Sequence, residues 1–166
     1  MSLGQLPPTG PPAPRLLDGE TRRALGTPRP HRLDANLFIY LFETGGPVAI
    51  AVRGLLNAAE AAGITFVVAS LALAEVAVHP VTIGDAVMAD RYADAIRSVN
   101  RLHVVPLTAD IAIDAGILRG QHGSSLPDAI HLATARQAGA SAFVTNDRRL
   151  RGLPKLEVVQ LADLVA

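Results

Sequence analysis

From residue 31 onward, two kinds of apolar pattern alternate along this chain. Short runs rich in β-branched and aromatic residues predict buried strands, and longer stretches with apolar residues three or four positions apart predict helices. Leu33 and the segment LFIYLF (37–42) predict a short strand that leads into a helix. Further strands are predicted at 64–69 (ITFVVA), 102–107 (LHVVPL), 141–147 (SAFVTND) and 156–161 (LEVVQL).

Several of the helical segments carry residues that typically begin or end a helix. Ser70 and Thr108 are each expected to cap the helix that follows. Pro127 lies near the start of another helix and Gly139 at its end, an asymmetry typical of helices. The predicted helices cover 48–63, 70–79, 83–99, 108–123 and 125–140.

Strands that alternate with helices predict an α/β fold with a mostly parallel sheet covered on both faces. The helices at 48–63 and 83–99 are amphipathic, so they either pack on the sheet or supply a dimer surface. In the second of these helices we expect four residues to face inward: Val87, Tyr92, Ile96 and Val99.

Composition narrows the classes of function. Fifteen basic residues balance fifteen acidic ones, which argues against a protein that coats nucleic acid non-specifically but allows a local basic strip. Cysteine is absent, so disulfides and thiolate metal sites are excluded. No apolar run has the length of a membrane span and no signal-peptide layout is present, so we expect a cytoplasmic protein. Residues 1–30 hold seven of the twelve prolines and predict a disordered or loosely attached tail before a domain at 31–166.

Four acidic residues fall at or near the junctions between strands and helices, where sites gather in parallel sheets. Asp34 ends the first strand, Asp128 opens a helix, and Asp147 follows the segment FVT. Glu75 lies within the otherwise apolar stretch SLALAEVAVH (70–79), where an ionised carboxylate needs a partner. The four carboxylates are therefore expected to converge on one point.

Each acid also has an ordinary structural interpretation. Asp34 fits a turn or a helix cap, and Asp128 fits the first turn of a helix. Asp147 fits a cap or an ion pair with an arginine that follows it, and Glu75 fits a buried hydrogen bond or a protonated acid. Converging carboxylates repel one another, however, and all-oxygen ligands select Mg²⁺ or Mn²⁺. We expect Asp34 and Asp128 to bind such an ion directly, with Glu75 and Asp147 acting through water.

Four segments of the chain resemble the PIN-domain nucleases, most closely the VapC-type toxins of bacterial toxin–antitoxin pairs. The resemblance covers about residues 31–161 and is carried by LDANLFIYLFE (33–43), LALAEV (71–76), LPDAIHLATARQAGASAFVTND (126–147) and LPKLEVV (153–159). It implies a PIN-like three-layer α/β/α sandwich with a mostly parallel central sheet. The chain departs from the family in TPRPHRL (27–33), where two prolines and a single apolar residue predict an unusually short first strand.

The resemblance also implies a site and an activity. The catalytic and metal-binding acids by position are Asp34, Glu75, Asp128 and Asp147, and the accompanying polar residues are Asn36 and Thr145. The implied activity is Mg²⁺- or Mn²⁺-dependent endoribonucleolytic cleavage by a metal-activated water, in a homodimeric toxin that a small antitoxin protein neutralises. Two alternatives stay open: a catalytically silent PIN-like domain that binds RNA or protein, and an unrelated phosphohydrolase acting on small phosphoesters.

Basic side chains near these acids have two interpretations each. Arg148, Arg149, Arg151 and Lys155 follow the last acid and either hold substrate phosphates or form a solvated loop. His131 lies one helical turn after Asp128, so it either touches substrate or has a structural role.

Overall fold

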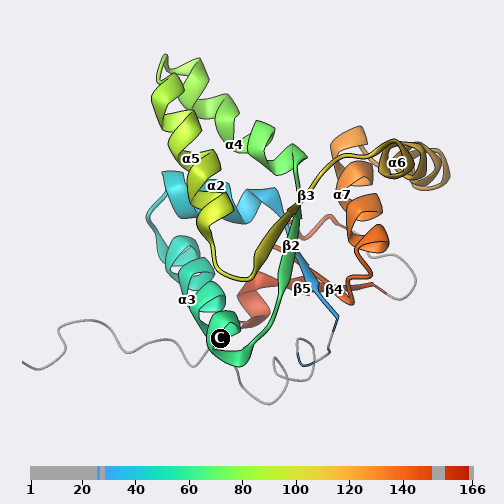
Figure 1. The fold of residues 1–166 in the computed structure, drawn as a ribbon, viewed down its shortest axis with the longest axis horizontal. Helices are drawn as coiled ribbons and strands as arrows, with labels where there is room; N and C mark the ends of the chain where they lie inside the picture. The colour runs from blue at the N-terminus through green and yellow to red at the C-terminus, as the bar shows by residue number, and fades with distance from the viewer. Residues whose placement is uncertain (1–25, 27–28, 151–155, 165–166) are drawn as a thin grey trace, which may run out of the picture.

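The computed structural model describes residues 26, 29–150 and 156–164. Five parallel strands form one sheet in the order β3-β2-β1-β4-β5 (Figure 1). The strands are β1 (His31–Leu33), β2 (Phe66–Ala69), β3 (Leu102–Val105), β4 (Ala142–Thr145) and β5 (Glu157–Gln160). The first strand is central and three residues long, as its proline-rich lead-in predicts.

Helices cover both faces of the sheet, which confirms the predicted three-layer α/β/α sandwich. One layer holds α2 (Ala35–Glu43), α3 (Pro47–Ala62), α4 (Leu71–Thr82) and α5 (Ala86–Ser98). The other layer holds α6 (Ala109–His122) and α7 (Leu126–Gln137), seen on the right of Figure 1. A short 3-10 helix, η1 (Leu161–Leu164), follows β5 and has no counterpart in the sequence prediction.

Each helical layer packs on its own face of the sheet, and the two apolar clusters lie on opposite faces. The reason is that alternate residues of each strand point to opposite faces. Leu33, Val68 and Val144 pack with α2, α3, α4 and α5. Phe143 packs with α6 and α7 on the other side of the sheet. The alternation sends Arg32 to the side of Phe143, where its guanidinium carbon lies 4.3 Å from the centre of the phenyl ring.

Local capping follows the sequence at some helices and departs from it at one. Thr108 accepts a hydrogen bond from the backbone N–H of Ile111 at 3.2 Å, which confirms it as the cap of α6. Ser70 occupies the N-terminal cap position of α4, but its hydroxyl makes no capping bond there. It instead accepts the backbone N–H of Leu107 at 3.1 Å, beyond the end of β3. The predicted cap position is therefore confirmed, but the hydroxyl does not make the capping hydrogen bond because the end of a neighbouring strand supplies a competing donor.

The predicted helix at 83–99 begins later than its apolar pattern indicated. Gly84 adopts a φ of 84°, a left-handed conformation that separates α4 from α5. Asp85 then caps α5 by accepting the N–H of Met88 at 2.8 Å. Ile96 is fully buried, as predicted, whereas Val87 is 63 % exposed, so its assignment to the inward face was wrong. The late start places Val87 in the first turn, beyond the core.

Two further predictions concern the ends of the chain and its relation to membranes. The predicted tail at 1–30 falls almost entirely outside the described residues. Within the described residues, no single helix is both long and apolar enough to cross a bilayer, and only α2 and α3 taken as a pair, bent by 119°, meet those criteria.

Candidate active site

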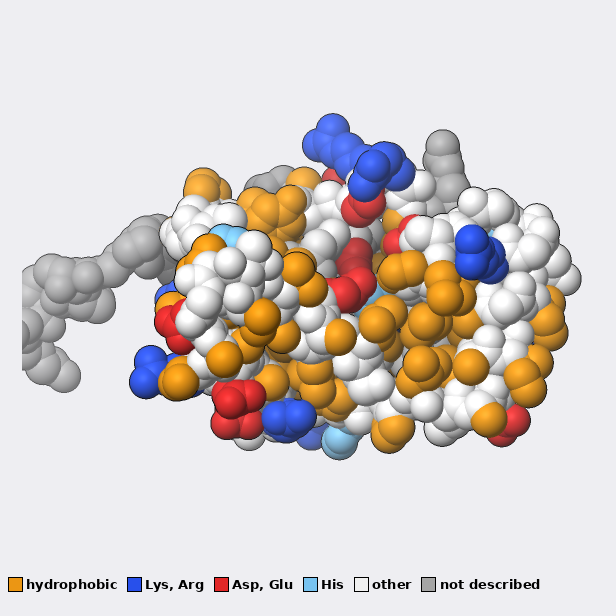
Figure 2. All heavy atoms as spheres, turned by 90° about the horizontal axis from the view of Figure 1, so that it is seen from above, with side chains coloured by type: hydrophobic (Ala, Val, Ile, Leu, Met, Phe, Trp, Pro, Cys, Tyr) orange, Lys and Arg blue, Asp and Glu red, His pale blue; other side chains and the backbone are white. Residues whose placement is uncertain are grey.

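The four predicted acids occupy the end of the molecule where the parallel strands finish. Asp34 directly follows β1, and Asp147 lies two residues beyond β4. Glu75 lies in α4, and Asp128 in the first turn of α7, a helix that contacts α4. Figure 2 shows this end: acidic side chains form a row that enters a hollow, with a histidine at its floor and arginine or lysine side chains at its rim.

Thr145 joins two of the acids through one buried hydroxyl. Its Oγ1 donates to Asp34 Oδ2 at 2.5 Å and accepts the backbone N–H of Asp147 at 3.0 Å. Asn36 Nδ2 also approaches this oxygen, at 3.4 Å. The backbone reinforces the junction, because Asp34 N–H donates to the carbonyl of Val144 at 2.9 Å. The ends of two neighbouring strands thus fix the positions of the first and last acids.

Glu75 is held by a histidine on the facing helix. His131 Nε2 lies 2.9 Å from Glu75 Oε2, and His131 Nδ1 contacts the Nη2 of Arg32. A guanidinium can only donate, so Nδ1 must be the acceptor and Nε2 must carry the ring proton. His131 is therefore a neutral ring that donates to the Glu75 carboxylate. The hydrogen bond is partly buried, since the Glu75 side chain is 29 % exposed, and it supplies a partner of the kind that the structural interpretation of Glu75 required.

Arg32 lies beneath the acids and is fully buried. Burial lowers its pKa from the ordinary value to about 10, while the negative charges of Asp34, Glu75 and Asp128 act in the opposite direction and raise it. The side chain therefore stays protonated at neutral pH. Three acids from three separate segments therefore lie close enough to act on this one guanidinium.

The remaining contacts tie the rim of the site to the same cluster. Ser125 Oγ donates to Asp128 Oδ2 at 2.6 Å and also caps α7 by accepting the N–H of Asp128. Arg149 forms a two-pronged contact with Asp147, with Nε–Oδ1 at 3.1 Å and Nη2–Oδ2 at 3.0 Å. These hydrogen bonds hold the pKa of Asp147 below its usual 3.8. Every one of the four carboxylates thus has a protein partner.

The chemistry of these side chains fits a hard divalent cation. The donors are carboxylate oxygens, and the Oδ1 of Asn36 is buried beside them without a hydrogen-bond partner. Within residues 29–150 and 156–164, no three Asp, Glu or His side chains stand together as ligands of one ion. Mg²⁺ commonly takes only one or two carboxylates directly and reaches the others through water. A site for this ion therefore does not require three side-chain ligands in direct contact with it.

The sequence interpretation covered most of this cluster and missed one member. It selected the four acids, Asn36, Thr145 and His131, but not Arg32. The sequence offers little signal for it, because Arg32 stands in the polar lead-in TPRPHRL (27–33), where a charged residue is not unusual. The side chain of His131 is only 5 % exposed, which favours its structural interpretation. Arg148 and Arg149 are exposed, whereas Arg151 and Lys155 lie outside the described residues.

A parallel α/β/α sandwich with acids gathered at the carboxyl ends of its strands defines a class of domain, and the sequence match agrees with it. The profile of the PIN domain family matches residues 32–156, and the chain belongs to this family. No curated protein sequence matches the chain significantly.

Solved structures with this fold include three from bacteria. A toxin–antitoxin complex from Klebsiella pneumoniae is 24 % identical, with 76 % of this chain and 94 % of that chain aligned and a TM-score of 0.56. VapBC2 from Rickettsia felis, bound to a promoter DNA fragment, is 21 % identical over 78 % and 97 %, with a TM-score of 0.62. The sarcin-ricin loop cleaving toxin VapC20 of Mycobacterium tuberculosis is 19 % identical over 68 % and 85 %, with a TM-score of 0.53. At these identities the likeness establishes the shared fold.

Proposed function

We propose that this chain is a divalent-metal-dependent endoribonuclease and the toxin of a toxin–antitoxin pair. The observation that carries the proposal is the gathering of Asp34, Glu75 and Asp128 around one buried guanidinium, with Asp147 tied to Asp34 through Thr145. Membership of the PIN family and the similarity in fold to an RNA-cleaving toxin support RNA as the substrate. A purely structural domain does not require four carboxylates at the end of the sheet where the strands finish.

The proposed cation is Mg²⁺ or Mn²⁺, with Asp34 and Asp128 as direct ligands. When bound, it supplies the charge that lowers the pKa of an attacking water and offsets the negative charge building on phosphorus. Glu75 and Asp147 would hold water at the site. Thr145 fixes the direction of Asp34, and the His131 N–H fixes that of Glu75, so neither carboxylate has to be ordered when substrate arrives.

Arg149 gives the site a means of accepting substrate. Its guanidinium is exposed and paired with the carboxylate of Asp147. A phosphate can take the place of this carboxylate, because a guanidinium binds two phosphate oxygens in the same two-pronged way. We propose that substrate draws Arg149 from Asp147 to the phosphodiester, which frees the carboxylate to hold water. Arg148, exposed beside it, would contribute a second phosphate contact.

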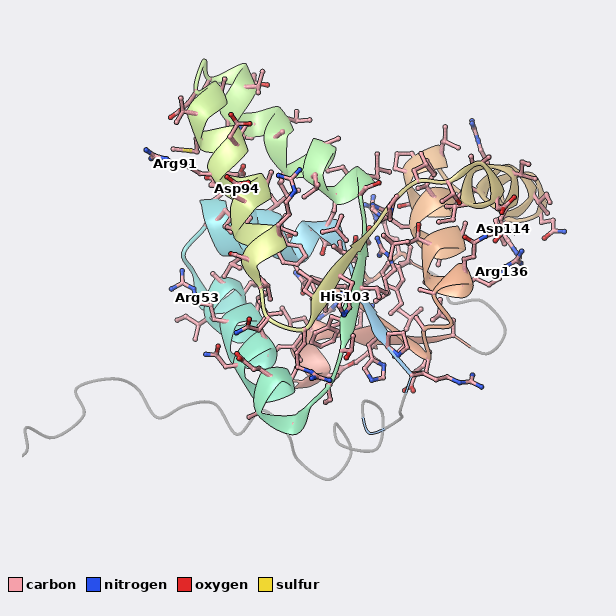
Figure 3. The ribbon with its side chains drawn as sticks, in the orientation of Figure 1. Arg53, Arg91, Asp94, His103, Asp114 and Arg136 are labelled. Atoms are coloured by element: carbon pink, nitrogen blue, oxygen red, sulfur yellow. The ribbon has the colours of Figure 1, made fainter. Side chains whose placement is uncertain are left out.

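The decisive experiment is RNA cleavage by the purified protein with and without chelator. We expect activity with Mg²⁺ or Mn²⁺, none after chelation, and recovery on adding the ion back. Asp34→Asn should lower the rate at least about 100-fold, because a neutral amide is a poor ligand for a hard cation. Asp94→Asn is the matched control, since Asp94 is exposed on α5 (Figure 3) and its ion-pair partner among the described residues is Arg97 on the same helix. Activity that survives metal removal would rule out this mechanism.

The toxin role is tested in growing cells. Expression of the chain should arrest growth, Asp34→Asn should relieve the arrest, and Asp94→Asn should not. Co-expression of a short neighbouring reading frame should restore growth and yield a complex, because the partner we propose is a small antitoxin protein. Light scattering of the purified chain tests the proposed homodimer. Normal growth with cleavage-competent protein would remove the toxin role and keep the nuclease.

The same assays separate the two alternatives. A catalytically silent PIN-like domain would bind RNA without cutting it and would show no heat of Mn²⁺ binding in calorimetry. A phosphohydrolase of small substrates would cleave nucleotide esters faster than RNA.

A further inference from the structure

Arg32 is an unusual residue for the middle of a central strand. Among the residues that the structure describes, it is the one Arg, Lys, Asp or Glu that is fully buried. Its Nη2 contacts His131 and its guanidinium stacks on Phe143, but its Nε and Nη1 have no hydrogen-bond partner. Burying a charge with so few hydrogen bonds is costly unless opposite charges lie close by.

The opposite charges available to Arg32 are the carboxylates of the candidate site. Asp34, Glu75 and Asp128 each stabilise the protonated guanidinium. The stabilisation is mutual, because the guanidinium lowers the repulsion among the three carboxylates. Glu75 has in addition a mechanical connection, in which Arg32 fixes the tautomer of His131 and His131 donates to Glu75.

We propose that Arg32 is a positioning residue that acts as an internal counter-ion: it holds the three acids together before a cation binds and limits the site to one divalent ion. Three negative charges and one positive charge leave two negative charges, which one divalent ion neutralises. Asp147 adds nothing to this balance while Arg149 is paired with it. The inference rests on the proposed function in taking these acids as cation ligands.

The first test is a calorimetric titration with Mn²⁺ of the full chain and two variants. The unaltered chain should bind one ion. Arg32→Met removes the charge while keeping a long apolar side chain, and it should bind Mn²⁺ about tenfold more tightly, because a nearby positive charge has been removed. Arg32→Lys keeps the charge and should bind with an affinity close to that of the unaltered chain. Unchanged or weaker binding by Arg32→Met would overturn the proposal, as would two ions of equal affinity in the unaltered chain.

A second test keeps Arg32 in place and needs no metal. In chelator, Glu75→Gln should lower the melting temperature, because it leaves the buried guanidinium with less opposite charge and the His131 N–H with a weaker acceptor. If carboxylate repulsion dominated instead, the same substitution would raise the melting temperature, and the proposal would fail. Glu43→Gln is the matched control: Glu43 also faces a histidine, His79 at 3.0 Å, but that histidine is more than half exposed.

The two tests separate this inference from the proposed function. If the unaltered chain does not bind Mn²⁺, the metal-dependent nuclease is rejected, and the sign of the Glu75→Gln shift still decides the role of Arg32. If Mn²⁺ binds and RNA is cut while Glu75→Gln raises the melting temperature, the nuclease stands and the counter-ion is rejected.

Discussion

Replacing Thr145 by valine tests the hydroxyl that connects two ends of the site. The side chain is fully buried at the end of β4, and valine has nearly its shape and favours strands equally well. The substitution therefore removes one oxygen and little else. Asp34 loses the donor at 2.5 Å, and the backbone N–H of Asp147 loses its acceptor at 3.0 Å.

The magnitude follows from these two bonds. A hydrogen bond to a charged group contributes about 1.5–3 kcal/mol and one between neutral groups about 1 kcal/mol. Asp34 is partly exposed, so water recovers some of its loss and the lower value applies. The contact with Asn36 is 3.4 Å long and adds little. We expect Thr145→Val to lower the free energy of unfolding by about 2–3 kcal/mol, which for a chain of this size lowers the melting temperature by about 5–10 °C.

Denaturant unfolding in chelator measures this loss, and Thr134→Val serves as the control. Thr134 is equally buried, but its hydroxyl donates only to the carbonyl of Ile130 within α7, so its loss should be below about 1 kcal/mol. RNA cleavage by Thr145→Val should fall at least about tenfold, because Asp34 is no longer held in one direction. Equal losses of stability in the two variants would refute the role assigned to Thr145, as would undiminished cleavage.

Three further predictions test the core, the rim and a helix start. Leu33→Ala should cost about 2–5 kcal/mol in denaturant unfolding, because this side chain is fully buried in the central strand, whereas Leu107→Ala, at a 47 % exposed position, should cost below about 1 kcal/mol. Arg149→Ala should raise the pKa of Asp147 toward 3.8 in an NMR titration of its carboxyl carbon. Because the pKa of Asp147 is lower in the folded chain than in the unfolded one, the pair with Arg149 stabilises the fold at pH values above the unfolded pKa. This stabilisation is lost as the pH falls through the folded pKa. The stability of Arg149→Ala should therefore depend less on pH in this acidic range. Ser125→Ala should cost about 1 kcal/mol in thermal unfolding, because the hydroxyl caps α7; no measurable loss would contradict that assignment.

Much of the fold could be read from local pattern because strands and helices have different apolar periods. The alternation of the two elements predicted the parallel sheet and its two helical layers, and Thr108 predicted the start of α6. Two errors arose where the local pattern was overridden, one by a partner distant in sequence and one by the residues just before a helix. Ser70 binds the N–H of Leu107 instead of capping its own helix. Periodicity placed Val87 inside, but the left-handed Gly84 and the Asp85 cap start α5 where that side chain faces water.

The site divides in the same way. Sequence alone selected Asp34, Glu75, Asp128 and Asp147, because three of them lie at junctions between strands and helices and Glu75 lies in an otherwise apolar stretch. Their partners had to come from the tertiary structure, since strand order and the packing of α7 on α4 decide which groups meet. Only the folded chain places Arg32 beneath the acids, 99 residues from the His131 that it contacts. The local sequence shows which charged side chains would cost free energy to bury. The opposite charges that offset this cost come close only when segments distant in sequence pack together.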